Sequence, residues 1–197
     1  MNIIVKPYGS DLCYCRPDTT WERENRDFYS PECVNKVLWA PVVFIRISKA
    51  GKCIGAKFAS RYYDAVGCGM LMYGDIPFSG NESQTAAGSQ ICSCIDHTSI
   101  LPSPMYDPVV LDDEKVLEVD FSCHWGNMQH AKYILNGAKG RLEDALCKAS
   151  QLTSFRIGDY VAVELAPLAV LTDKKDGEVS VQGTFCENEI FEFKIIF

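Results

Sequence analysis

The chain contains 197 residues, of which 47% are hydrophobic, and 26 acidic residues outnumber 19 basic ones for a net charge of −7. This length predicts a single domain over residues 1–197 that can bury its own core without disulfides or a structural metal. The acidic balance, with Lys and Arg scattered singly, argues against a nucleic-acid partner because phosphate binding needs a basic face. The longest apolar run, residues 37–45, is interrupted by Pro41 and is far shorter than the roughly 20 residues of a membrane-spanning helix. We therefore expect no membrane insertion.

The cysteine content and the first residues indicate a cytoplasmic location. Ten cysteines are few for a chain that can build its own core, so they fit reduced thiols better than a disulfide scaffold. Only three aliphatic residues precede Lys6, too few for the apolar segment of a secretory signal. We therefore expect a cytoplasmic protein.

Short or alternating apolar patterns dominate the first half of the chain and predict β-strands. In chain order, these strands cover residues 3–6, 12–16, 37–48 and 67–73. Between the last two, large apolar residues recur every four positions from Ile54 to Val66 and predict a helix over residues 54–66. Residues 74–89 are rich in Gly, Ser, Asn and Thr and predict a loop.

The second half continues the β-rich pattern around one helix. Three prolines between residues 100 and 108 predict a stiff, extended connector. Strands are predicted over residues 116–124, 160–171, 178–186 and 190–197. The last two flank a short polar turn and predict a C-terminal hairpin. Leu142, Leu146 and Ala149 form an apolar stripe that predicts a helix over residues 138–152.

Motifs for nucleophilic or phosphate chemistry are missing from the sequence. It contains no Gly-x-Ser-x-Gly nucleophile motif, no phosphate-binding loop and no dinucleotide-binding fingerprint. Soft ligands for zinc are present at Cys92, Cys94, His97 and Cys123. However, Cys92 and Cys94 are separated by one residue, whereas zinc fingers use a gap of two, and on a strand a one-residue gap places both thiols on one face. Core or partly exposed thiols are therefore the favoured interpretation of these residues, and a zinc-binding structural protein is the alternative.

Several stretches, taken in order, resemble segments of one family. Residues 13–19 (Cys-Tyr-Cys-Arg-Pro-Asp-Thr) resemble a Phe-x-Lys-Pro-x-Thr/Ser segment, residues 42–52 a central strand with its turn, and residues 58–69 a helix entering the next strand. Residues 155–159 and 189–194 resemble a closing Leu-x-x-Gly-Asp element and a terminal hairpin. Together they resemble the fumarylacetoacetate hydrolase family, specifically its short single-domain members that act on acylpyruvates and related keto acids. The resemblance implies a β-rich α+β fold, a mixed β-roll or sandwich with two main helices.

The resemblance also identifies the positions at which this family holds a magnesium or manganese ion. Family members use Glu-x-Glu on the central strand and an Asp on the following strand. In this sequence those positions are occupied by Ala40, Val42 and Leu71. A hard divalent cation needs about six oxygen ligands, which alkyl side chains cannot supply. The resemblance therefore implies that the metal cofactor and its catalytic residues are lost.

Other family features are partly kept. The family's lysine before a Phe-Asp pair is replaced by Ser93, while the Asp is matched by Asp96, and Arg16 stands where the family has Lys. Any remaining pocket would be largely apolar and would bind a small carboxylate or an apolar ligand. Its expected lining is Arg16, Ala40, Val42, Leu71, Tyr73, Ser93 and Asp96.

The leading hypothesis is a non-catalytic binding or partner subunit, a pseudoenzyme with a possible small-molecule ligand. Because family members are commonly dimers, the resemblance implies a homodimer or a heterodimer with an active relative. One alternative is an active metal-dependent hydrolase, decarboxylase or isomerase of keto acids, acting at C–C bonds, whose ligands are displaced to residues such as Glu32, Asp64 or Asp75. The zinc-binding structural protein is the other alternative.

Overall fold

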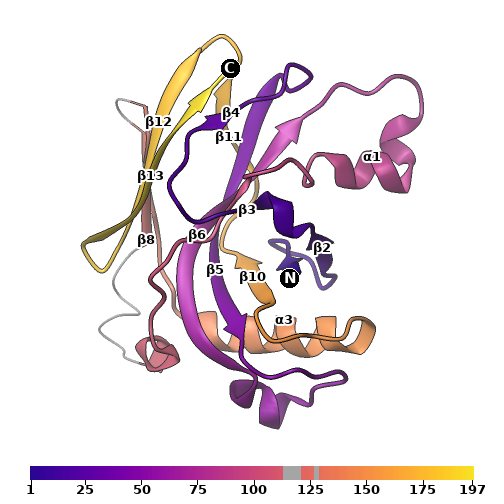
Figure 1. Ribbon diagram of the computed structural model, residues 1–197, viewed down its shortest axis with the longest axis vertical. Helices are drawn as coiled ribbons and strands as arrows, with labels where there is room; N and C mark the ends of the chain where they lie inside the picture. Colours follow the sequence, from indigo (N-terminus) through magenta and orange to yellow (C-terminus); the bar gives the residue numbers. More distant parts are fainter. Residues whose placement is uncertain (113–120, 127–128) are drawn as a thin grey trace.

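The computed structural model describes residues 1–112, 121–126 and 129–197, whose strands form two sheets (Figure 1). Sheet A contains, in spatial order, β2 (Tyr14–Arg16), β1 (Ile3–Lys6), β10 (Tyr160–Glu164), β5 (Lys36–Ile47), β6 (Tyr63–Asp75), β7 (Ser99–Ile100) and β3 (Trp21–Glu22), with β11 (Ala169–Asp173) also paired to β5. Sheet B contains, in spatial order, β4 (Phe28–Tyr29), β13 (Asn188–Ile196), β12 (Glu178–Phe185), β8 (Phe121–Trp125) and β9 (Gln129–Tyr133). The β-rich α+β class expected from the sequence is confirmed.

Helices are few and lie around the sheets. Within the described residues, the α-helices are α1 (Ala86–Ile91) and α3 (Ala138–Leu152), and the 3-10 helices are η1 (Asp18–Thr20), η2 (Ala56–Arg61), η3 (Glu82–Gln84) and η4 (Pro108–Asp112). None of the helices that the structure describes is long and apolar enough to cross a membrane.

The long antiparallel pair β5 and β6 organises the molecule. Its ladder runs from Lys36 opposite Asp75 to Ile47 opposite Tyr63. Sheet B lies on one side of this pair, whereas the N-terminal segment with β2 and α1 lies on the other (Figure 1). Because successive side chains of a strand point to opposite faces, the pair contributes to two separate cores.

The larger core lies between sheet A, sheet B and α3. From β5 it receives Val43 and Ile45, and from α3 it receives Leu142 and Leu146, all fully buried. Trp39 of the same strand packs edge-on against Trp125 of sheet B, with ring centroids 5.0 Å apart. Aromatic pairs in this geometry add to the stabilisation that burial alone provides.

The smaller core lies on the opposite face of sheet A. It contains the alternate residues of the same strands, among them Val42, Phe44 and Leu71, together with Ile3 and Tyr160. Sheet A is therefore buried on both faces along its central strands. This explains why β5 is apolar at almost every position instead of alternating between apolar and polar residues.

Several sequence predictions agree with the structure. The strand over residues 3–6, the helix over residues 138–152 and the C-terminal hairpin are present as β1, α3 and β12–β13. In the predicted loop 74–89, however, Ala86–Ile91 forms the short helix α1, whose N-cap Thr85 accepts a hydrogen bond from the Gly88 N–H at 3.0 Å. The predicted strand 116–124 is described only from residue 121, as β8, and its earlier part lies outside the described residues.

Two predicted elements are wrong. The helix over residues 54–66 is replaced by the shorter η2 followed by β6, because pairing with β5 gives residues from Tyr63 onward a full strand ladder. Aromatic and β-branched residues suit that ladder, so tertiary pairing overrides the four-residue spacing. The single strand over residues 160–171 is divided into β10 and β11 by residues 165–168, where Pro167 has no N–H to donate.

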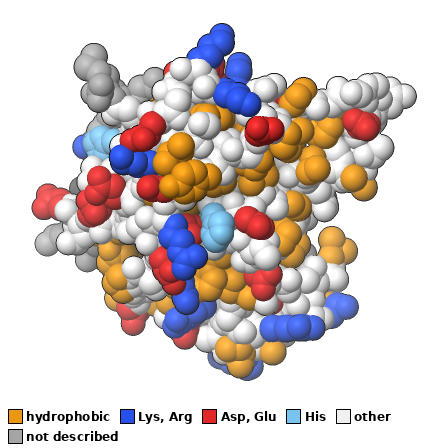
Figure 2. Space-filling view, turned by 45° about the horizontal axis from the view of Figure 1, so that its top comes forward, with side chains coloured by type: hydrophobic (Ala, Val, Ile, Leu, Met, Phe, Trp, Pro, Cys, Tyr) orange, Lys and Arg blue, Asp and Glu red, His pale blue; other side chains and the backbone are white. Residues whose placement is uncertain are grey.

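One face of the surface carries both signs of charge. Figure 2 shows acidic and basic side chains mixed over this face, with hydrophobic side chains exposed between them. No broad field of a single sign covers the described residues in this view. The charges around each individual hollow therefore decide which ligand it favours.

Candidate functional site

The three positions expected to hold a metal lie together on one face of β5 and β6. Ala40 is directly opposite Leu71 in the ladder, and Val42 is the next residue on that face of β5. All three side chains are fully buried, at 0% exposure, and Val42 and Leu71 belong to the smaller core. We call this trio the apolar socket. It provides no oxygen ligand, so it does not fit magnesium or manganese.

The displaced ligands proposed as an alternative do not converge. Asp64 and Asp75 lie at opposite ends of β6, eleven residues and hence about 36 Å apart. Asp64 is paired with Arg46, with both oxygens 3.0 Å from guanidinium nitrogens, and the carbonyl of Glu32 accepts a hydrogen bond from Lys174. Among the residues that the structure describes, no three His, Cys, Asp or Glu side chains are grouped to hold a metal ion.

The proposed zinc ligands are also separated. Cys123 lies on β8 in the larger core, where burial raises the pKa of its thiol. Cys92 lines the hollow beside Tyr73, whereas Cys94 and His97 line another hollow beside Phe28, and no three of these side chains are grouped among the residues that the structure describes. The zinc alternative is therefore wrong for these four residues.

Arg16 is a fully buried cation whose guanidinium group is hydrogen-bonded mainly to backbone carbonyls of this region. Its Nε donates to the carbonyl of Ser93 at 2.7 Å, and one terminal nitrogen donates to the carbonyl of Met72 at 2.8 Å and to the Thr98 hydroxyl at 2.7 Å. Its guanidinium carbon lies 4.9 Å from the centroid of the Tyr73 ring. Burial lowers the pKa of Arg16. Arg16 thus joins β2 to β6 and to the chain before β7.

A chain of hydrogen bonds links two tyrosines to a buried carboxylate. Tyr73 donates its hydroxyl proton to Oε1 of Glu164, and the hydroxyls of Tyr14 and Tyr73 are 2.6 Å apart. Because a phenol has one proton and Tyr73 gives its own to Glu164, Tyr14 is the donor to Tyr73. The second oxygen of Glu164 accepts the backbone N–H of Tyr8 at 2.9 Å. Burial raises the pKa of Tyr14 to about 12 and also raises that of Tyr73.

These groups line an open pocket of about 660 Å³, which we call the tyrosine pocket. Such a volume suits a small organic molecule. Leu38 and Tyr73, which are opposite each other in the β5–β6 ladder, form part of its wall beside the apolar socket. The full lining is Pro7, Tyr8, Tyr14, Leu38, Tyr73, Gly74, Asp75, Gln90, Cys92, Ser93, Glu164, Pro167 and Leu168.

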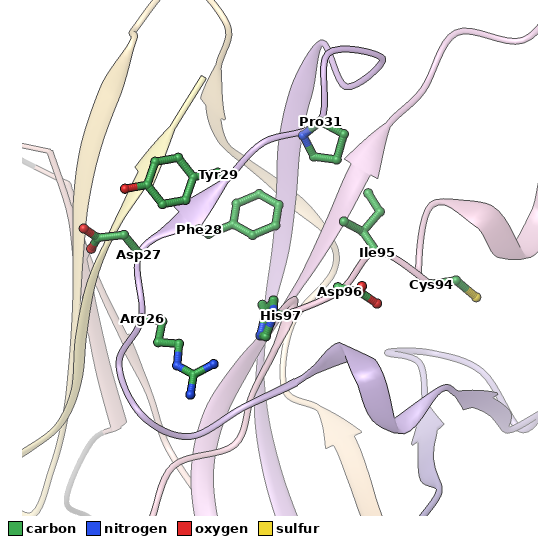
Figure 3. Close-up of a pocket in the computed structure, with 9 residues that line it drawn as sticks. All are labelled: Arg26, Asp27, Phe28, Tyr29, Pro31, Cys94, Ile95, Asp96 and His97. Atoms are coloured by element: carbon green, nitrogen blue, oxygen red, sulfur yellow. The ribbon is translucent and has the colours of Figure 1, made fainter.

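The sequence-predicted pocket is therefore divided among several places. Tyr73 and Ser93 line the tyrosine pocket, whereas Arg16 does not. Asp96 is exposed and lines a different hollow of about 770 Å³ (Figure 3). That hollow lies between the segment around β4, which contributes Phe28 and Pro31, and the chain before β7 (Figure 3). Ala40, Val42 and Leu71 of the apolar socket are buried at 0% exposure and line neither of these two hollows.

The second hollow contains a histidine held by a buried carboxylate. Nδ1 of His97 lies 3.0 Å from Oε2 of Glu22, whose other oxygen accepts the backbone N–H groups of Arg23 and Glu24. His97 has a φ of 58°, in the left-handed region that residues with a side chain rarely adopt. These contacts fix the orientation of the imidazole ring at the edge of the hollow.

Sequence reasoning missed Tyr14, Glu164, Glu22 and His97 as members of these sites. For Glu164 a signal existed, because it ends the otherwise apolar run of residues 160–163, where an acidic residue is expected to need a partner. For Glu22 and His97, 75 residues apart, no local pattern predicts the contact.

No family model matches the sequence, and no curated protein matches it. Solved structures do match its fold. A Yersinia pestis CO92 protein described as belonging to the fumarylacetoacetate hydrolase family aligns with a TM-score of 0.72 and 11% identity, over 99% of this chain and 92% of that one. This chain has the fumarylacetoacetate hydrolase fold.

Two enzymes of known name share this fold. Fumarylpyruvate hydrolase from Pseudomonas aeruginosa, solved with Mn²⁺ and pyruvate, aligns with a TM-score of 0.71 and 11% identity over 100% of this chain and 90% of that one. Maleylpyruvate hydrolase from Sphingobium sp. SYK-6 aligns with a TM-score of 0.70 and 13% identity over 99% of this chain and 69% of that one. At these identities the likeness concerns the fumarylacetoacetate hydrolase fold and not the chemistry, which depends on the site residues.

Proposed function

We propose that this protein is a non-catalytic form of the fumarylacetoacetate hydrolase fold, acting as a binding or partner subunit instead of a metal-dependent hydrolase of keto acids. The observation that carries the proposal is the apolar socket. In the family pattern, carboxylates at these three positions hold the cation that polarises the keto oxygen. Here Ala40, Val42 and Leu71 are fully buried, and Val42 and Leu71 belong to the smaller apolar core.

The energetics of burial support this proposal. A divalent cation in the apolar socket would lose its water shell and gain no ligand from these three side chains, a cost of many kcal/mol. The nearby carboxylate of Glu164, opposite Val42 in the β10–β5 ladder, already accepts hydrogen bonds from Tyr73 and from the Tyr8 N–H. Arg16, a charged group expected at the pocket from the resemblance, is a cation whose Nε and one terminal nitrogen donate to two backbone carbonyls and Thr98, while its other terminal nitrogen has no hydrogen-bond partner among the described residues. Neither the three side chains of the apolar socket nor the Arg16 guanidinium offers a ligand for magnesium or manganese.

The test is a turnover assay of the full chain with fumarylpyruvate and maleylpyruvate in the presence of Mn²⁺ or Mg²⁺. The Pseudomonas aeruginosa enzyme serves as the positive control. We expect the loss of substrate absorbance to match that of a protein-free sample. Turnover that requires the metal and stops on addition of EDTA would overturn the proposal.

A further inference from the structure

The charges and hydrogen-bond donors of the tyrosine pocket differ from those of a site for an anion. Among the residues that the structure describes, no Lys, Arg or His lines it, whereas Glu164 and Asp75 do. Glu164 is only 5% exposed. A carboxylate ligand would therefore meet two acidic side chains and no basic one at the wall.

The hydrogen-bond direction leads to the same conclusion. Tyr73 gives its proton to Glu164 and Tyr14 gives its proton to Tyr73, so both phenol oxygens have only lone pairs left for a ligand. The Ser93 hydroxyl donates to the carbonyl of Gln90 at 2.7 Å and is likewise left as an acceptor. The polar end of the pocket consequently needs a ligand that donates hydrogen bonds.

The remaining walls suit an apolar body and a positive charge. Leu38, Pro167 and Leu168 provide apolar surface, and Tyr8 and Tyr14 provide aromatic rings, whose faces attract cations. The buried cation Arg16 lies over the Tyr73 ring but does not line the pocket, and it donates three hydrogen bonds to protein acceptors while its other terminal nitrogen has no hydrogen-bond partner in the part of the chain that the structure describes. Lys6, at the end of β1, is paired with Asp144 at 2.5 Å.

We infer that the tyrosine pocket binds a small organic ammonium ion with an apolar or aromatic body. The ammonium group donates hydrogen bonds to Tyr14, Ser93 and the Glu164 carboxylate, and the body packs against Leu38 and Leu168. This inference rests on the proposed function, because it assigns a ligand class to a fold whose metal positions are apolar. The inferred ligand is a cation, whereas a keto acid is an anion.

The test is isothermal titration calorimetry of the full chain with 2-phenylethylammonium and with 3-phenylpropionate, two ligands of similar shape and opposite charge. We expect the ammonium ion to bind at least about tenfold more tightly than the carboxylate, a difference of about 1.4 kcal/mol. Pyruvate serves as a second anion. Equal or tighter binding of either carboxylate overturns the inference.

Three variants connect binding to this pocket. Glu164→Gln keeps the shape of the side chain and should weaken ammonium binding about tenfold, whereas Glu192→Gln, an exposed change on β13, should leave it unchanged. Leu168→Lys places a cation at the half-exposed rim without altering the buried network, so it should abolish ammonium binding and admit 3-phenylpropionate. Thermal melting checks that each variant is folded. Unchanged ammonium binding in Leu168→Lys contradicts the inference even where Glu164→Gln does not fold.

The two proposals fail in different ways. Metal-dependent turnover of a keto acid removes the proposed function whatever the calorimetry gives. Preference for the carboxylate without turnover removes the ligand assignment alone and leaves the non-catalytic proposal in place.

Discussion

The apolar socket and the tyrosine pocket lie next to each other on the same face of β5 and β6. Ala40 and Leu71 form the cross-strand pair of the socket, and the next pair on that face, Leu38 and Tyr73, forms a wall of the pocket. The side chains of the socket are fully buried, whereas the pocket is open and has a buried carboxylate at its polar end. The contrast shows that one face of a sheet can be closely packed at one cross-strand pair and still border a cavity at the next pair.

The largest effect on the free energy of unfolding is expected from placing a carboxylate in the apolar socket. Leu71→Asp buries a charge without a partner and should lower the free energy of unfolding by about 3–5 kcal/mol. Leu168→Asp, at the half-exposed rim of the pocket, should change it by less than about 0.5 kcal/mol. Urea denaturation followed by circular dichroism measures both. Equal stability of the two variants would show that the socket is hydrated and would remove the contrast.

Arg16 is expected to contribute the next largest effect. Arg16→Met leaves the carbonyls of Ser93 and Met72 without this donor and should cost about 2–4 kcal/mol. The matched change Arg26→Met affects an exposed arginine paired with Glu24 and should cost less than about 1 kcal/mol. The same urea experiment compares them. A small effect at Arg16 would mean that the region beside the pocket rearranges freely.

Removing the Tyr14 hydroxyl is expected to have a smaller effect on the free energy of unfolding, and this effect depends on pH. Tyr14→Phe removes the hydrogen bond to Tyr73 and should cost about 1 kcal/mol at pH 7. Because burial raises the pKa of Tyr14 from 10 to about 12, the unfolded chain loses its proton first, and stability falls as the pH rises from 10 through 12. The variant lacks this group and should lose less stability between pH 9 and pH 11.5 than the parent protein.

Tyr29→Phe is the control for this alkaline titration, because Tyr29 is 71% exposed. Its stability should follow that of the parent protein across the same pH range. A parent protein and a Tyr14→Phe variant with parallel pH profiles would contradict the buried position of Tyr14 at the pocket.

The smallest effect on the free energy of unfolding is expected from the ion pair between Lys6 and Asp144. The pKa of Asp144 is lowered mainly by its hydrogen bond from Lys6, so the ion pair contributes stability above pH 3.8 that is lost as the pH falls below that value. Since the Asp144 side chain is 42% exposed and solvent screens the ion pair, Asp144→Asn should cost only about 0.5 kcal/mol at pH 7. The difference in stability between the variant and the parent, measured in urea, should shrink as the pH falls below 3.8. A difference that stays constant as the pH falls would show a role for Asp144 other than charge.

The apolar socket could be predicted from the sequence because its residues follow from strand register. The resemblance, in the register set by Arg46 and Gly51, named Ala40, Val42 and Leu71 as the expected metal positions, and the ladder pairs Ala40 with Leu71. The helix α3 was predictable for a related reason, since its apolar stripe faces a core and no other element competes for its backbone.

The tyrosine pocket could not be predicted because its members come together only through tertiary structure. Tyr14 and Tyr73 are 59 residues apart, and Tyr73 and Glu164 are 91 apart. Nothing in the local pattern of β2 or β10 specifies that these side chains meet. The incorrect helix over residues 54–66 has the same cause, because its spacing was outweighed by pairing with a distant strand.

The measurement that tests the central claim most directly is a titration of the full chain with Mn²⁺, followed by the electron paramagnetic resonance signal of the free ion. If the apolar socket has replaced the metal site, the signal of free Mn²⁺ at protein excess should equal that of buffer. A stoichiometric loss of that signal, reversed by Mg²⁺ and abolished in a variant of β5 or β6, would contradict the account.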